Sequence, residues 1–313
     1  MTPPWITERL SVAEWKQRAA TLEQTLGPML RDYLQKRSWH TKNPILDFLF
    51  EYYNFRPASL LRWSPGFGVA LEGEEADSFL DQKEFVKHDG LVMLDPSRFP
   101  AHRNLTLQWI RDLLQITLAR SPVWGCFGMH EWAMVYRIDR PRHAHIPLRL
   151  PADEIAAFVE SRPLVCTHFD AFRFFTPKAK PMNRLPLTRM NQEEYEQPGC
   201  LHANMDLYKW AHKLYPWVDS ELLADAFLIA CETRTVDMQA SPYDMRDQGL
   251  EPICVETPEG RQIYQERQQA MMEQAMPIRQ RLLEAYNRLL DAIKTTAPET
   301  STSTYSSSVH NMT

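Results

Sequence analysis

Apolar residues recur at helical spacing over most of the chain, which predicts a mainly helical protein with a few short strands. The pattern Ser11-Val-Ala-Glu14 is a capping box that opens a first helix ending near Arg37. Asn43-Pro44 then opens a second, apolar helix over residues 45–54. Further helices are expected over residues 101–120, 129–137, 201–215, 220–240 and 257–295, and Pro277 should kink or split the last of them.

Two stretches lack this helical period. Between residues 63 and 100, short apolar pieces such as GVAL (68–71) and LVML (91–94) lie among glycines and prolines, which indicates short strands or irregular structure. The run LVCTHFDAFRFF within residues 163–176 is rich in aromatic and β-branched residues, which predicts one buried strand or extended segment. No repeat or flexible linker divides the chain, so we expect a single helical domain over residues 1–296 and a disordered polar tail over 297–313.

Charge and composition narrow the function classes. The formal net charge of −5 gives no overall basic field, so contact with nucleic acid would need a local basic patch. The five cysteines are widely spaced and contain no C-x-x-C pair, which is typical of reduced, mostly buried thiols. Because the sequence has neither a secretion signal nor an apolar run of about 20 residues, we expect a cytoplasmic protein without a membrane partner.

The segment GMHEWAMVYR (128–137) carries the first candidate chemistry. Its apolar residues cover nearly every side of a helical wheel, which predicts a buried helix. His130, Glu131 and Arg137 would then be removed from water, which costs several kcal/mol unless they are paired or hydrogen-bonded. They are either a structural ion-pair network or a functional group, as a general acid–base pair or as metal ligands.

A second candidate lies in the predicted extended segment, where alternation places His168 and Asp170 on one face. A histidine beside a carboxylate in apolar surroundings suits proton transfer near neutral pH. The alternative is a hydrogen-bonded core histidine without a catalytic role. Arg173 could pair with this group or clamp an anion.

The helix over residues 201–215 places His202, Asp206, Lys209 and Lys213 on one face. The simplest interpretation is a solvated face with ion pairs between neighbouring turns. If this face instead forms the wall of a cleft, the two lysines could contact phosphate.

Asp237 falls on the apolar stripe of the helix over residues 220–240, close to its end. It precedes a turn that carries Tyr243 and Asp244. A buried aspartate at such a position is a candidate site residue.

Several long runs resemble a bacterial family known as 3-methyladenine DNA glycosylases. They are ILDFLFEYYNFRPASLLRW, CFGMHEWAMVYR, THFDAFRFFTP, QPGCLHANMDLYKWAHKL and DMQASPYDM, and the resemblance covers the chain from about Asn43 to the final helix. It implies a hydrolase that removes an alkylated purine from DNA. Such an enzyme needs an aromatic pocket for the cationic base and a carboxylate that helps the base to depart or activates water.

Under this resemblance, Asp170 or Glu131 is the carboxylate at the glycosidic bond, and His168 or His130 orients water. Lys209 and Lys213 hold phosphate. The candidate substrate-binding residues are Trp132, Tyr136, Arg173, His202, Asp206, Lys209, Asp237, Tyr243 and Asp244. The partner would be DNA or a purine-containing small molecule, and no cofactor is required.

Two other function classes stay open. His168, Asp170 and His202 have the composition of a two-histidine, one-carboxylate site for iron or another divalent metal, as in a non-haem iron oxidoreductase. His130 with Glu131 could replace or extend that site. Alternatively, the chain is a non-catalytic helical interaction protein whose histidines and carboxylates only stabilise the core. Metal content separates the two enzyme classes, and the sequence leaves the oligomeric state open.

Overall fold

The computed structural model describes residues 3–139, 141 and 145–296, and helices dominate them, as predicted. The α-helices are α1 (Val12–Ser38), α2 (Asn104–Ala119), α3 (Met129–Val135), α4 (Ala152–Glu160), α5 (Phe169–Phe172), α6 (Gln192–Tyr195), α7 (Leu201–Leu214), α8 (Ser220–Gln239) and α9 (Pro258–Thr296). The strands are β1 (Glu8–Leu10), β2 (Val69–Leu71), β3 (Phe85–His88) and β4 (Leu91–Leu94). Single turns of 3₁₀-helix join several of these elements.

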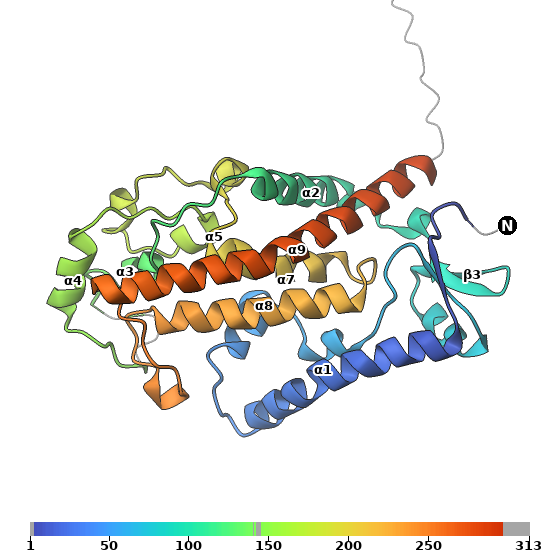
Figure 1. The fold of residues 1–313 in the computed structure, drawn as a ribbon, viewed down its shortest axis with the longest axis horizontal. Coiled ribbons are helices and arrows are strands. Elements are labelled where there is room, and N and C mark those ends of the chain that lie inside the picture. Colours follow the sequence, from blue (N-terminus) through green and yellow to red (C-terminus); the bar gives the residue numbers. More distant parts are fainter. Residues whose placement is uncertain (1–2, 140, 142–144, 297–313) are drawn as a thin grey trace, which may run out of the picture.

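The long helices build the centre of the molecule. α7, α8 and α9 pack against one another, α1 packs on α8, and α2 packs on α9. Figure 1 shows α8 and α9 side by side, with the small sheet at one end of the molecule and α3, α4 and α5 towards the other. The buried apolar side chains form one connected core that includes residues of α1, α7, α8 and α9.

Local capping signals place the first helices. The side chain of Ser11 accepts a hydrogen bond from the Glu14 amide, and the Glu14 carboxylate accepts one from the Ser11 amide, which confirms the predicted capping box. The side chain of Asn43 caps the next turn. The residues that follow, Phe48–Tyr52, form a π-helix rather than part of the α-helix predicted over residues 45–54. π-Turns are rare and are frequent at functional sites.

The sheet has the strand order β1-β2-β4-β3. β1 and β2 are parallel, whereas β2–β4 and β3–β4 are antiparallel. Asp89 and Gly90 join β3 to β4 with φ angles of 47° and 81°, as a tight hairpin turn requires. The strands expected near residues 68–71 and 91–94 are confirmed, but β1 is only three residues long and has no recognisable alternation.

One further expectation about local structure is wrong. Residues 163–176 do not form a strand: the amides of Phe172 and Arg173 bond back to the carbonyls of His168 and Phe169, which closes the helical turn α5. His168 and Asp170 are therefore not alternating residues of one strand face. Of the kink or split expected at Pro277, the split does not occur, because the last helix continues over 39 residues.

The predicted tail, residues 297–313, lies outside the described residues. In the part of the chain that the structure describes, no helix combines the length and the apolar character needed to cross a membrane. The single-domain organisation of residues 1–296 stays a prediction.

Gly260 marks a close approach between α9 and the segment before it. A Cβ atom at this position would lie 1.9 Å from the carbonyl oxygen of Cys254. Because backbone must move to make room, Gly260→Ala should lower the free energy of unfolding by about 1–3 kcal/mol in denaturant titrations. Gly125→Ala is the control, since its Cβ would lie an ordinary 3.8 Å from Val165 and should cost no stability. Equal stability of the two variants would contradict this packing.

Candidate metal centre

Two groups of polar side chains meet where α3 and α5 approach α7 and α8. The inner site consists of Cys126, His130, Glu131, His202, Arg234 and Asp237. The outer cluster consists of Tyr53, His168, Asp170, Arg173, Glu196, Asp206 and Lys209. Most of these side chains are buried, which makes their pairing energetically decisive.

A sharp turn aims His130 at α8. Phe127 and Gly128 have φ angles of 45° and 70°, and a Cβ atom at Gly128 would lie 3.1 Å from the Cβ atom of Ala240. This close approach seats the start of α3 against the end of α8. His130, in the first turn of α3, therefore reaches Asp237, in the last turn of α8.

An ion-pair network holds the inner site. His130 Nε2 lies 2.6 Å from Asp237 Oδ1. Arg234 donates to Asp237 Oδ2 and, over 3.1 Å, to Glu131 Oε1. Arg234, Glu131 and Asp237 are all buried, so each charge depends on these partners.

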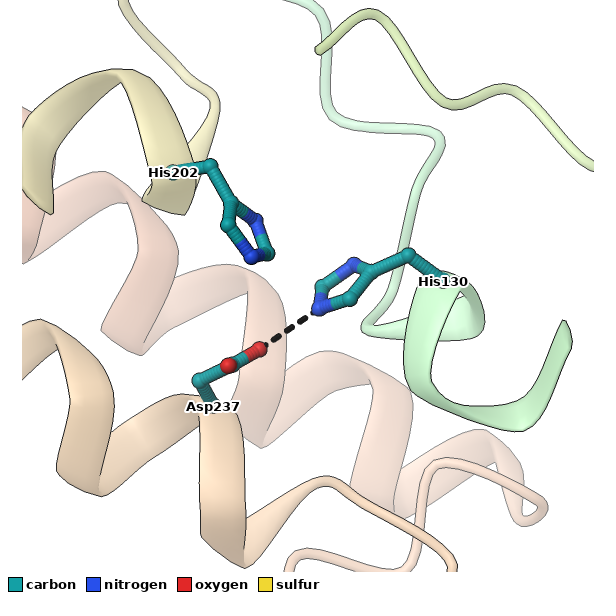
Figure 2. Close-up of side chains that lie close together, drawn as sticks. All are labelled: His130, His202 and Asp237. Carbon is teal, nitrogen blue, oxygen red and sulfur yellow. Dashed lines mark hydrogen bonds and ion pairs between the residues drawn. The ribbon is translucent and has the colours of Figure 1, made fainter. Parts of the chain in front are cut away.

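His202 completes a group that could hold a metal ion. His130, His202 and Asp237 each offer one ligand atom, and these three atoms lie within 4.8 Å of one another. Figure 2 shows the two imidazoles and the carboxylate, from α3, α7 and α8, directed towards a common centre. The ring of His202 stands at 84° to that of His130, with 4.5 Å between centroids. Among the described residues, neither ring nitrogen of His202 forms a hydrogen bond.

The charges of the inner site shift its pKa values in opposite directions. Burial alone would raise the pKa of Asp237, but His130 and Arg234 hold it well below its ordinary range. Burial alone would lower the pKa of His130, but Asp237 and Cys126 raise it well above its ordinary range. Burial, together with the nearby charge of His130, lowers the pKa of His202 well below its ordinary value.

The outer cluster extends from the core to the surface. Tyr53 donates to Asp206 Oδ1 over 2.7 Å, and Lys209 donates to Asp206 Oδ2 and Asp170 Oδ2 over 3.2 Å each. Arg173, which is partly exposed, pairs with Asp170 at 3.2 Å. The polar face of α7 is therefore not simply solvated, because Asp206 is only 2% exposed.

Aromatic rings of the π-turn contact both groups. The guanidinium of Arg234 lies 4.0 Å from the ring centroid of Phe48. Phe48 stacks on Tyr52 with 4.9 Å between centroids, and the guanidinium of Arg173 lies 5.9 Å from the Tyr52 centroid. The π-turn thus forms an aromatic wall that connects the inner site to the outer cluster.

The structure brings together most, but not all, of the candidate residues. His130, Glu131, His202 and Asp237 belong to the inner site, and His168, Asp170, Arg173, Asp206 and Lys209 belong to the outer cluster. The expected metal set His168, Asp170 and His202 does not form one group: in the described chain, His130 and Asp237 take the places of His168 and Asp170.

Other candidates lie outside both groups, and their proposed roles stay predictions. The Trp132 indole is fully buried and donates to the Ala240 carbonyl oxygen. The Tyr136 hydroxyl donates to Glu160, Tyr243 is buried beside an isolated bridge to Leu148, and Asp244 pairs with Arg246. Lys213 is exposed. Arg137, expected to be buried, is about half exposed and pairs with Glu160, because α3 ends at Val135.

Sequence reasoning missed several residues of the two groups. Arg234 lies one helical turn before Asp237, and Cys126 lies four residues before His130, with its Sγ 3.4 Å from His130 Nδ1. Both spacings are visible in the sequence. Tyr53 and Glu196 carry no such signal, because they reach the outer cluster only through the tertiary fold.

Comparison of the chain with protein-family models, curated proteins and solved structures found no match. The function must therefore be inferred from the geometry of the site itself.

Removing Arg234 should expose how much the inner site depends on paired charges. Arg234→Met leaves the buried carboxylates of Asp237 and Glu131 without their guanidinium. It should lower the free energy of unfolding by about 3–5 kcal/mol near neutral pH. The matched control is Arg281→Met, which breaks an exposed pair with Asp225 and should cost less than about 1 kcal/mol.

This loss should also depend on pH. In the wild type, the lowered pKa of Asp237 contributes stability above the ordinary value of 3.8, and that contribution is lost only as the pH falls towards the folded-state pKa. Without Arg234 the folded-state pKa rises, so the variant neutralises this carboxylate at a higher pH. Urea titrations should show the gap between variant and wild type narrowing as the pH falls from about 7 to about 4. A gap independent of pH would contradict an electrostatic role.

Proposed function

We propose that the protein is a metal-dependent enzyme whose inner site holds a divalent first-row metal ion, with non-haem iron as the preferred metal. The observation that carries this proposal is the group formed by the buried His130 and Asp237 and the partly buried His202, with its three ligand atoms within 4.8 Å of one another. Two imidazoles and one carboxylate form a ligand set that suits iron(II) and leaves coordination positions open for substrate and oxygen. The reaction class is an oxidoreduction of a small substrate.

The residues around the ligands support this role. Arg234 donates a hydrogen bond to Asp237 Oδ2, the carboxylate oxygen that does not contact His130. The Sγ atom of Cys126 contacts the Nδ1 atom of His130. Such outer contacts orient metal ligands and are typical of metal sites. Phe48 packs over Arg234 and covers one side of the network.

A purely structural ion-pair network explains the site less well. In such a network every buried polar group has a partner. His202 is partly buried between two other imidazoles, and in the described part of the chain its ring nitrogens form no hydrogen bond within the protein. A metal ion between His130, His202 and Asp237 would supply the missing partner.

Metal content tests the proposal directly. Protein purified without chelator should contain at least one iron, manganese or zinc ion per chain by elemental analysis. His202→Ala should lose the inner ion, with an affinity at least about ten-fold lower, because one of three ligands is gone. The control is His212→Gln on the same helix, where the ring stacks on Phe55 outside the inner site. Metal-free wild type, or unchanged content in His202→Ala, would contradict the proposal.

A base-releasing hydrolase is the second candidate. It is favoured by the position of Asp170, which pairs with Arg173 beside the stacked rings of Phe48 and Tyr52. An aromatic surface next to a carboxylate suits an alkylated purine. However, Lys209 and Arg173 already neutralise Asp170, which disfavours binding of a cationic base.

The two candidates depend on different residues. If the protein releases bases, Asp170→Asn should abolish release of 3-methyladenine from alkylated DNA while leaving the circular dichroism spectrum unchanged, because the amide keeps the shape but loses the charge. His202→Ala is the paired control and should retain release. Undiminished release by Asp170→Asn would remove this role.

We also propose a cytoplasmic location. All five cysteines are free, although only Cys166 is fully buried. Free, partly accessible thiols suit a reducing compartment.

A further inference from the structure

His168 is a buried histidine without a hydrogen bond. Its side chain is 1% exposed, and neither Nδ1 nor Nε2 has a hydrogen-bond partner among the described residues. Buried polar groups nearly always have hydrogen-bond partners, so an imidazole held only by ion-pair contacts needs an explanation. The inner site does not provide one, because His168 is not part of that group.

Two buried carboxylates face the ring of His168. His168 Nε2 lies 3.4 Å from Asp206 Oδ2 and 3.8 Å from Glu196 Oε2. Both carboxylates are no more than 3% exposed. These separations are long for hydrogen bonds but match neighbouring ligands of one metal ion, which lie within roughly 4 Å of each other.

The charges around Glu196 leave room for a cation. Lys209 is engaged by Asp206 and Asp170, and Gln192 donates to Glu196 as a neutral amide. Among the described residues, His168 is the only basic side chain within ion-pair distance of Glu196. Arg279 acts on Glu196 only from beyond ion-pair distance, so a bound cation would stabilise this buried carboxylate.

The second group adjoins the inner site. The ring of His168 stacks on that of His202, with 5.3 Å between centroids and 26° between planes. His202 and Asp206 are one turn apart on α7. The same helix therefore supplies a ligand to the inner site and a carboxylate to its neighbour.

We infer that His168, Glu196 and Asp206 form a second divalent-cation site, which makes the buried histidine cluster a two-metal centre. The inference rests on the proposed function for the first ion. Among the described residues, only the inner site has all its ligand atoms within 4.8 Å of one another, so Asp206 and Glu196 must close around the second ion when it binds. Two adjacent ions can hold one substrate between them, which a single ion cannot do.

Manganese binding to chelator-treated full-length protein tests the inference. Equilibrium dialysis with Mn(II) should give two ions per chain for the wild type and one for His168→Ala. Glu196→Gln preserves the shape of the side chain but removes its charge. It should lower the affinity for the second Mn(II) ion at least ten-fold. His212→Gln, a histidine of α7 outside both groups, should keep two. Paramagnetic resonance should show spin coupling between the ions in the wild type and an isolated-ion signal in His168→Ala, with circular dichroism confirming the fold.

His202→Ala separates this inference from the proposed function. If the wild type binds one ion that is lost in His202→Ala but kept in His168→Ala and Glu196→Gln, the second site is overturned and the first stands. If one ion is lost in His168→Ala and kept in His202→Ala, the second site stands and the proposed function is overturned. A wild type that binds no Mn(II) overturns both.

Discussion

The contact between His130 and Asp237 is the constraint on which the candidate site depends. It joins the first turn of α3 to the last turn of α8, and both side chains are buried. Charges in such surroundings are tolerated only when they are paired, so Arg234 and Glu131 must complete the network. The positive φ of Gly128 allows the close approach of the two helices that this pairing requires.

The histidines relate the two groups to one another. His202 lies between His130 on one side and His168 on the other, and its lowered pKa keeps it neutral beside them. From His168 the outer cluster continues through Asp206, and it ends at side chains near the surface. A buried centre with a charged edge and an aromatic wall is a suitable arrangement for chemistry that must exclude water.

Much of the site could be selected from the sequence, but not its pairings. The all-round apolar pattern correctly predicted that α3 is buried, and hence that His130 and Glu131 need partners. Asp237 was selected because it falls on an apolar stripe. The partner predicted for His168 was wrong. Alternation in a strand suggested Asp170, but His168 precedes the helical turn α5 and lies beside Asp206 and Glu196.

The sequence by itself determined the long helices, the cap of the first one and part of the set of buried ionisable residues, because these follow from periodicity and from contacts within a few residues. Only the tertiary structure decided which carboxylate meets which imidazole. His130 and Asp237 are 107 residues apart, and Tyr53 and Asp206 are 153 apart. No local pattern encodes contacts over such separations, because they arise when long helices pack and the desolvated charges find their partners.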